Sequence, residues 1–304
     1  MVKIFGKEIT TREFDCIAEN ETGPIPIAKP FIYLFIQTSD ICQANCPFCI
    51  YHNNIPKDFD VDKLGTILRE LSNDDSYRVR KLNLTGGEPL LDLKLFDKIC
   101  NCILNNFKFD DHFTGITLNT NGINLDKFLD YDCLFDFLAL SRHHYLDNKN
   151  AQIFGTNTVP TIEQLLDFYE QLERKFIVIL RCNLITGQID SFEQIKKYLD
   201  YFLLYDFKKF SFVTLAPNND FCKSHQVDFH TLIKENDDLL KIQQYTRIEE
   251  NKYYCRCSNY AYTNETGKIA TIYTRNFCNN YIKDSTLVYD GKYLRYGFGG
   301  EIIF

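Results

Sequence analysis

Three closely spaced cysteines could hold an inorganic centre. Cys42, Cys46 and Cys49 lie in the segment CQANCPFC, at a C-x3-C-x2-C spacing. A closed structural zinc site uses four protein ligands, and most cubane iron–sulfur clusters also take four cysteines. A set of three thiolates therefore leaves one coordination position open for chemistry. The alternatives are a structural zinc knuckle whose fourth ligand lies nearby, such as His52, or three unrelated thiols.

The second motif is TGGEP, at residues 85–89. It follows a short alternating stretch that predicts a strand, and it precedes a predicted helix. At a strand end, Gly86 and Gly87 would let the backbone approach a ligand closely. Glu88 offers a carboxylate to a cationic group, and Pro89 stops the strand.

Together and in this order, the two motifs resemble those of the radical S-adenosylmethionine (radical SAM) enzymes. The resemblance implies that Cys42, Cys46 and Cys49 hold a 4Fe-4S cluster whose fourth iron is chelated by SAM. In that family the reduced cluster cleaves SAM to methionine and a 5′-deoxyadenosyl radical, which abstracts a substrate hydrogen. The electron donor implied is of the flavodoxin or ferredoxin type.

The resemblance also assigns SAM contacts. Phe48 matches an aromatic position whose backbone lies near the adenine. The segment that binds the SAM ammonium group corresponds to Gly86, Gly87, Glu88 and Pro89.

Composition agrees with a globular enzyme. The chain has 304 residues, 45% of them hydrophobic, which suits one full domain and a small appendage. A net charge of −7 argues against nucleic acid or an anionic membrane as the main partner. There is no membrane-spanning stretch or secretory h-region, so we expect a cytoplasmic protein, in which the twelve cysteines are metal ligands and buried thiols.

Strand and helix signals alternate from about residue 31 to residue 217. Six strands are expected, at 31–36, 81–84, 115–119, 135–140, 176–183 and 210–215. Helices are expected between and after them, at 61–71, 93–105, 125–129, 161–174, 191–204 and 228–244. Six parallel strands with right-handed crossovers predict an α/β fold, a partial (β/α)6 TIM barrel, which is also the fold that the resemblance implies. We divide the chain into an N-terminal segment 1–30, the barrel 31–245 and a C-terminal extension 246–304.

The carboxyl ends of barrel strands are where active sites gather, and polar residues follow several of them. After the third strand, Asn121 matches a segment common in radical SAM enzymes, and after the fourth, Ser141 matches a position that contacts SAM. Ser141 opens a polar run whose other members are candidate catalytic residues: Arg142, His143, His144 and Tyr145. A solvated loop is the alternative for the two histidines.

The fifth strand carries Arg181 and Asn183, which the period of two places on one face. A charge inside a barrel needs a partner. That partner is either a ligand carboxylate or phosphate, which makes Arg181 a candidate cofactor-binding or catalytic residue, or a buried carboxylate of the protein. After the sixth strand, Ala216 lies near the adenine by the same resemblance.

The last fifty residues predict a hairpin-rich extension. They resemble the small C-terminal (twitch-like) extension of the GTP 3′,8-cyclase branch, which holds a second 4Fe-4S cluster. Cys278 matches the first cysteine of that cluster, but Tyr281 stands in place of the second. Cys255 and Cys257 could replace the missing ligands. The alternative is that the second cluster is lost.

Three functions are compatible with these features. The first is hydrogen abstraction from a small-molecule or nucleotide-derived substrate, and the second is modification of a ribosomally made peptide. The first thirty residues are few for a leader-binding domain, which favours the first function. GTP cyclisation is not expected, because Phe35, Asn83 and Ser285 replace basic residues of the cyclase. The third function is that of a non-catalytic iron–sulfur or zinc protein.

Overall fold

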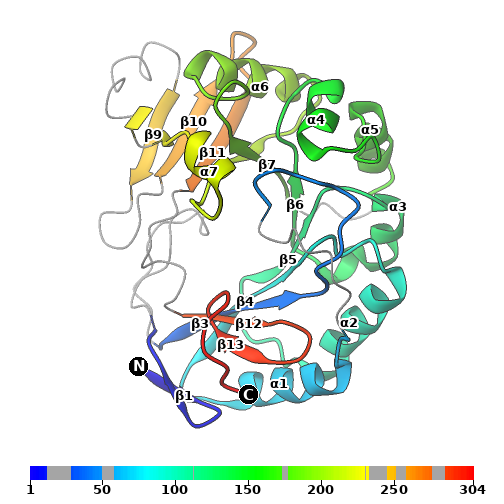
Figure 1. Cartoon of the computed structure of the whole chain (residues 1–304), viewed down its shortest axis with the longest axis vertical. Coiled ribbons are helices and arrows are strands. Elements are labelled where there is room, and N and C mark those ends of the chain that lie inside the picture. The colour runs from blue at the N-terminus through cyan, green and yellow to red at the C-terminus, as the bar shows by residue number, and fades with distance from the viewer. Residues whose placement is uncertain are drawn as a thin grey trace.

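The computed structural model describes residues 1–11, 29–49, 58–111, 113–172, 177–229, 231–232, 245–250, 258–275 and 285–304. Its main feature is an 11-stranded sheet with the strand order β13-β12-β3-β4-β5-β6-β7-β8-β11-β10-β9. Among the described strands, the edge strands β13 and β9 are not neighbours, so this sheet is an open, curved wall and not a closed barrel (Figure 1).

The centre of the wall consists of six parallel strands in chain order. They are β3 (Phe31–Gln37), β4 (Arg78–Thr85), β5 (Gly115–Thr120), β6 (Phe137–Ser141), β7 (Ile177–Leu184) and β8 (Lys209–Thr214). All six predicted strands are present, with ends shifted by a few residues. The prediction of a partial (β/α)6 barrel is confirmed.

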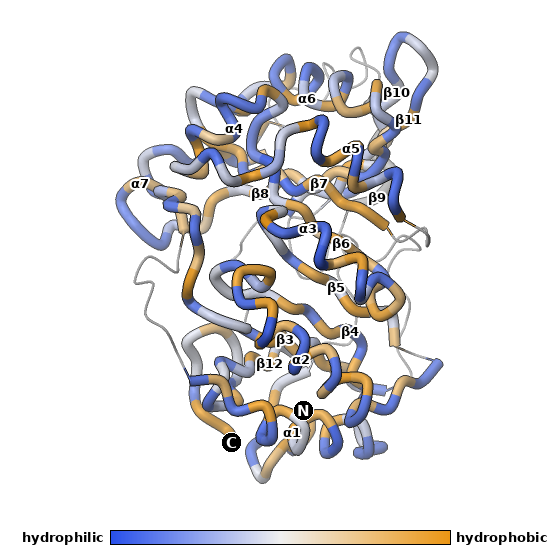
Figure 2. Tube along the Cα trace, turned by 90° about the vertical axis from the view of Figure 1, so that its right-hand side faces the viewer, coloured by the Kyte–Doolittle hydropathy of each residue, from blue (hydrophilic) through white to orange (hydrophobic). Residues whose placement is uncertain are grey.

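Helices follow these strands along the chain. They are α1 (Val61–Asn73), α2 (Leu93–Asn106), α3 (Leu125–Phe128) with the 3-10 helix η1 (Leu129–Leu134), α4 (Asp147–Phe154), α5 (Ile162–Glu170), α6 (Phe192–Leu204) and α7 (Asp220–Ser224). Of these, α1, α2, α3, α5 and α6 cover the convex side of the wall (Figure 1). Figure 2 shows hydrophobic and hydrophilic residues alternating along these helices, as expected for elements with one buried face. The helix predicted at 228–244 lies mostly outside the described residues.

Alternation along each central strand separates the two faces of the wall. On β7, Leu180 and Cys182 are buried in the core that packs against the helices. On β8, Phe210 and Phe212 belong to the same core. Residues between them, such as Arg181, therefore face the concave inner side.

The C-terminal region extends both edges of the wall. Strand β11 (Ile269–Arg275) pairs parallel to β8, and it is followed outward by β10 (Ser258–Thr263) and β9 (Tyr245–Glu250). At the opposite edge β12 (Thr286–Tyr289) pairs parallel to β3 and antiparallel to β13 (Leu294–Tyr296). The expected hairpin-rich extension is therefore divided between the two edges, and the domain boundary at residues 245 and 246 stays a prediction.

The chain termini lie side by side at the β12–β13 edge (Figure 1). An unpredicted hairpin, β1 (Val2–Ile4) and β2 (Lys7–Ile9), carries the N-terminus. Its turn residue Phe5 stacks on Phe304 with ring centroids 4.3 Å apart, and Lys7 forms an ion pair with Glu301 at 2.6 Å. Within the described residues, no helix has the length and apolarity to cross a bilayer.

Candidate functional site

The segment 38–49, which carries Cys42, Cys46 and Cys49 and is called the cysteine loop below, follows β3 at the carboxyl edge of the wall. It packs against α4. The backbone N–H of Asn45 donates to the carbonyl of Phe154, at 2.7 Å. Cys46 is buried in a small apolar cluster with Phe154 and Val159. The polar loop is therefore anchored by an apolar contact to the helix that follows β6.

The three motif thiols are close enough to influence one another. Burial raises the pKa of Cys42 to about 11 and also raises that of Cys46, and Cys49 adds to both shifts. The sulfur of Cys42 accepts hydrogen bonds from the Ala44 N–H and from Asn121 Nδ2, each at 3.4 Å. These donors stabilise a thiolate, and a metal that binds the thiolates would displace their protons.

A single metal ion and a cubane cluster make different demands on their thiolate ligands. Among the described residues, no three His, Cys, Asp or Glu side chains surround one ion position. A zinc site requires its ligands to meet at one ion, whereas the thiolates of a cubane cluster each bind a different iron. Binding of iron by Cys42, Cys46 and Cys49 stays a prediction.

The glycines of the TGGEP turn are required by the cysteine loop itself. The Gly87 N–H donates to the Ser39 carbonyl at 2.5 Å, and the Glu88 N–H donates to the Ile41 carbonyl at 2.8 Å. A Cβ on Gly86 would overlap the backbone of Ser39, and one on Gly87 would overlap the backbone of Ile41. Close backbone approach was predicted at this turn, and the structure shows the cysteine loop as the partner.

Glu88 uses its carboxylate to hold the end of β5. One oxygen accepts from the Leu90 N–H at 3.0 Å and from the Thr120 hydroxyl at 2.6 Å. The other oxygen accepts from the Asn121 N–H at 2.7 Å. The side chain is buried, and this burial outweighs the three hydrogen bonds and raises its pKa to about 7. Binding of the SAM ammonium group by Glu88 stays a prediction.

Asn121 connects the two motifs. Its backbone donates to Glu88, and its side-chain Nδ2 donates to the sulfur of Cys42. Its Oδ1 accepts from Gln43 Nε2 at 2.9 Å and from the Ile123 N–H at 3.1 Å. A displacement of Asn121 would thus reach both the cysteine loop and the TGGEP turn.

The loop after β6 is buried, so the solvated-loop alternative for the histidines is wrong. His143 and His144 are only 4% and 6% exposed. Burial lowers the pKa of His143 to about 3 and that of His144 to about 4, so both are neutral. His143 accepts from the Asn183 N–H at 3.1 Å and contacts the ring of Phe48 edge-on at 5.0 Å. It therefore fixes the aromatic residue between two cysteines of the motif.

Arg142 organises the same loop. It is 1% exposed, and its charge is balanced by Asp147 at the start of α4. Its guanidinium also donates to the carbonyls of His144 at 3.1 Å, Tyr145 at 3.3 Å and Pro160 at 2.8 Å. These bonds position Arg142 as a support for the loop. Catalytic roles for residues 142–145 stay predictions.

Arg181 lies on the inner wall, as its strand position predicted. Its guanidinium donates to the Asn119 side-chain oxygen at 2.5 Å. The other predicted contacts, Ser141, Asn183 and Ala216, are half-buried at the carboxyl ends of β6, β7 and β8, on the edge that carries the cysteine loop. Cys255, Cys257 and Cys278, the suggested second set of ligands, lie outside the described residues.

Sequence reasoning missed the support from α7. Asn219, just before α7, donates through Nδ2 to the Pro47 carbonyl at 3.0 Å, and the Cys222 thiol donates to the Phe48 carbonyl at 3.6 Å. The Asn219 side chain also accepts from the Cys222 N–H at 2.8 Å, as a helix N-cap. An Asn-Asp pair before a short apolar run is the one local signal for this helix.

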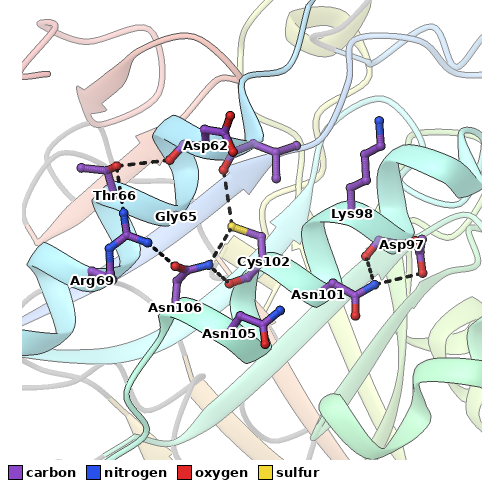
Figure 3. A pocket seen from close by; sticks show the side chains of 11 residues that line it. Asp62, Gly65, Thr66, Arg69, Asp97, Lys98, Asn101, Cys102, Asn105 and Asn106 are labelled. Atoms are coloured by element: carbon purple, nitrogen blue, oxygen red, sulfur yellow. Dashed lines mark hydrogen bonds between the residues drawn. The ribbon is translucent and has the colours of Figure 1, made fainter.

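A groove of about 420 Å³ lies between α1 and α2, and Figure 3 shows its polar lining. Its lining includes two basic side chains, Arg69 and Lys98, and two acidic ones, Asp62 and Asp97, so the formal charges cancel. None of the predicted site residues lines this groove.

Comparisons with known proteins agree with this geometry. Residues 36–213 match the radical SAM superfamily. An uncharacterised protein of Methanocaldococcus jannaschii is 23% identical over 248 residues, covering 78% of this chain and 83% of that protein. The GTP 3′,8-cyclase of Limosilactobacillus fermentum is 25% identical over 224 residues, covering 66% of this chain and 64% of the cyclase.

A solved structure shares the fold. Streptococcus suis SuiB bound to the precursor peptide SuiA superposes with a TM-score of 0.59 at 13% sequence identity, covering 86% of this chain and 58% of SuiB. The matched parts are thus less than two thirds of the length of either SuiB or the cyclase.

Proposed function

Because this chain belongs to the radical SAM superfamily of enzymes, we propose that its cysteine loop holds a SAM-cleaving 4Fe-4S cluster and that the product radical abstracts hydrogen from a small-molecule or nucleotide-derived substrate. The packing of the cysteine loop on Gly86 and Gly87 carries the proposal. The contact joins the segment just before Cys42 to the turn that the resemblance assigns to SAM, which supports the proposal. A cytoplasmic location and a flavodoxin- or ferredoxin-type donor belong to the same proposal.

The residues of the site have separate tasks. Cys42, Cys46 and Cys49 would bind iron. When bound, the reduced cluster supplies one electron to SAM, which yields methionine and the 5′-deoxyadenosyl radical. The Asn121 amide donates a hydrogen bond to the Cys42 sulfur, and such bonds tune the potential of iron–sulfur centres.

SAM would lie along the carboxyl edge of the wall. Contacts are proposed from the turn 86–89 and from the strand-end residues Phe48, Asn121, Ser141, Asn183 and Ala216. Phe48 is held at two points: the ring of His143 packs against its ring, and the Cys222 thiol donates to its backbone carbonyl. This fixed backbone is a suitable support for a flat adenine ring.

The first test is iron and sulfide content after anaerobic reconstitution, combined with SAM cleavage under dithionite. About four irons per chain with 5′-deoxyadenosine formed would support one cluster, and about eight would support a second cluster as well. Cys42→Ala, Cys46→Ala and Cys49→Ala should each abolish cleavage. The matched control is Cys133→Ala, at an exposed cysteine, which should cleave SAM normally. Cleavage retained in any of the three motif variants would contradict the cluster assignment.

The second cluster is tested separately. Cys278→Ala should lower the iron count without removing the SAM-binding cluster, if Cys255, Cys257 and Cys278 hold iron. Unchanged iron content would show that they do not.

A ribosomally made peptide is the second candidate substrate. SuiB, which has the same fold, was solved with a precursor peptide. A short peptide reading frame beside the gene, whose product stimulates SAM cleavage, would favour this candidate. GTP cyclisation is not proposed, because Phe35, Asn83 and Ser285 stand where the cyclase has basic residues.

A further inference from the structure

One row of polar residues crosses the inner face of the wall on five neighbouring strands. Ser141 on β6 is paired in register with Arg181 on β7, which is paired with Ser211 on β8. The row continues through Tyr273 on β11 to Asn259 on β10. Residues paired in register point to the same side of a sheet. We call these five residues the polar row.

The polar row faces the concave side of the wall. The residues that flank it along the strands belong to the core against the helices: Leu140, Leu180, Cys182, Phe210, Phe212, Tyr260 and Ile272. The row also begins at Ser141, one of the proposed SAM contacts, and ends in the C-terminal strands. It therefore links the proposed cofactor site to the region where this chain departs from the cyclase pattern.

Two buried hydroxyls on this inner face have no hydrogen-bond partner in the described structure. Ser211, in the row, is 2% exposed, and Thr117, on β5, is 3% exposed. Leaving such a group unsatisfied costs stability, and native proteins rarely do so without a reason. A polar ligand on the inner face would supply the missing partner.

The charge of the row indicates the kind of ligand. Arg181 is the one charged member of the row, and its guanidinium is directed by the Asn119 oxygen. The Asn119 amide is in turn fixed by a hydrogen bond to the Leu84 carbonyl at 3.0 Å. Lys209, two residues before Ser211, adds a second half-buried cation on the same face. A guanidinium beside a hydroxyl donor is an arrangement suited to carboxylate or phosphate oxygens.

We propose that Arg181 and Ser211 seat an anionic group of the substrate, a carboxylate or a phosphate, on the inner wall, while Asn259 and Tyr273 contact the polar part of the substrate beside it. This inference rests on the proposed function and narrows its substrate class. It places the substrate across β7, β8 and β11, next to the SAM contact at Ser141.

The test titrates the reconstituted, SAM-loaded enzyme with inorganic phosphate and with succinate by calorimetry. Binding of phosphate alone supports a phosphorylated substrate, and binding of succinate alone supports a carboxylate. Arg181→Gln should lower the affinity for the probe by ~10- to 100-fold, and Ser211→Ala should lower it by ~3- to 10-fold. Arg69→Gln removes the same charge from the outer groove and should bind the probe like the wild type.

Two outcomes overturn the proposal: neither probe binds the wild type, or Arg181→Gln binds as tightly as the wild type. SAM cleavage under dithionite is measured on the same preparations. Absence of cleavage in the wild type would count against the proposed function, whereas cleavage without anion binding would count against this inference alone.

Discussion

Buried polar side chains at the rim of the wall and on its inner face differ in how completely they are hydrogen-bonded. The rim, formed by the loops after β3, β4, β5 and β6, contains Glu88, Asn121 and Arg142, and each makes several hydrogen bonds. On the inner face, the hydroxyls of Thr117 and Ser211 are equally buried but make no hydrogen bond in the described structure. Saturated polar groups shape a site, and unsatisfied ones are available to a ligand.

This difference in hydrogen bonding predicts that the rim contributes to stability and that the inner face contributes to binding. The rim gains from its hydrogen bonds, because each buried carboxylate, amide or guanidinium would otherwise be desolvated without compensation. Each unsatisfied hydroxyl of the inner face costs about 1–3 kcal/mol by contrast. Changes at the rim should therefore unfold or loosen the protein, and changes at the inner face should affect binding first.

The largest effect is expected from Gly87→Ala at the rim. The added methyl group would overlap the Ile41 backbone, which cannot move without displacing the cysteine loop. We expect loss of most bound iron after reconstitution and a destabilisation above about 3 kcal/mol in urea unfolding. The control is Gly267→Ala, where open space surrounds the Cβ and only the left-handed φ of 81° is unfavourable, at a cost of about 1–2 kcal/mol. Equal iron content in both variants would contradict the packing role of Gly87.

A second test of the rim uses pH. The unfolded chain has histidine pKa values of about 6.5, and burial lowers those of His143 and His144 to about 3 and about 4. Between these values the unfolded state binds more protons, so the stabilisation present above pH 6.5 is lost as the pH falls. At pH 5 His143 alone should remove about 2 kcal/mol of unfolding free energy relative to pH 7.5.

The measurement is urea unfolding of the wild type and of His143→Gln from pH 7.5 to pH 5. The unfolding free energy of the variant is expected to fall less steeply as the pH is lowered, because only one of the two buried histidines, His144, then remains to take up a proton on unfolding. Parallel profiles would show that His143 is not held neutral by the fold.

Asn121→Ala should have an intermediate effect. The change leaves the Gln43 amide and the Ile123 N–H without their acceptor, and it removes the donor to the Cys42 sulfur. A destabilisation of about 2–3 kcal/mol is expected from lost buried hydrogen bonds. The cluster should still assemble but at a more negative reduction potential, which potentiometric EPR measures. An unchanged potential would separate Asn121 from the cluster.

Local patterns were sufficient for the central strands and for the motifs. Buried parallel strands such as β3 are near-continuous apolar runs in the sequence. The helix expected from residue 161 begins there, with Thr161 and Gln164 forming a capping box at the start of α5. The C-x3-C-x2-C spacing and TGGEP each lie in one short segment, so no tertiary information was needed to identify them.

Features that depend on distant contacts were not predictable. Helix α4 has a weakly amphipathic sequence, and its first residue is held by Arg142 and its last by Asn45. The C-terminal hairpins are close together in the sequence, but β11 pairs with β8 and β12 pairs with β3, at opposite edges of the central strands. No local pattern predicts which edge each hairpin joins. The burial of His143 was not predictable from its own loop, because the rings of Phe48 and Phe154 that contact it come from other segments of the chain.

The smallest effect, and the most direct comparison of the two regions, comes from two threonines on β5. Both are 3% exposed. At the rim, the Thr120 hydroxyl donates to Glu88 at 2.6 Å and accepts from the Gly122 N–H at 2.9 Å. On the inner face, Thr117 Oγ1 makes no hydrogen bond. Thr120→Val should therefore lower the unfolding free energy by about 1–3 kcal/mol, whereas Thr117→Val should leave it unchanged or raise it slightly.

Each variant replaces one hydroxyl with a methyl group on the same strand, so each controls for the effect of this exchange in the other. Urea unfolding of the ligand-free protein measures both, and a loss in Thr117→Val equal to that in Thr120→Val would mean that the inner hydroxyl is satisfied in solution. Repeating the measurement with saturating phosphate or succinate sharpens the comparison. A ligand that reaches Thr117 stabilises the wild type more than Thr117→Val, because ligand stabilisation scales with affinity for the folded state.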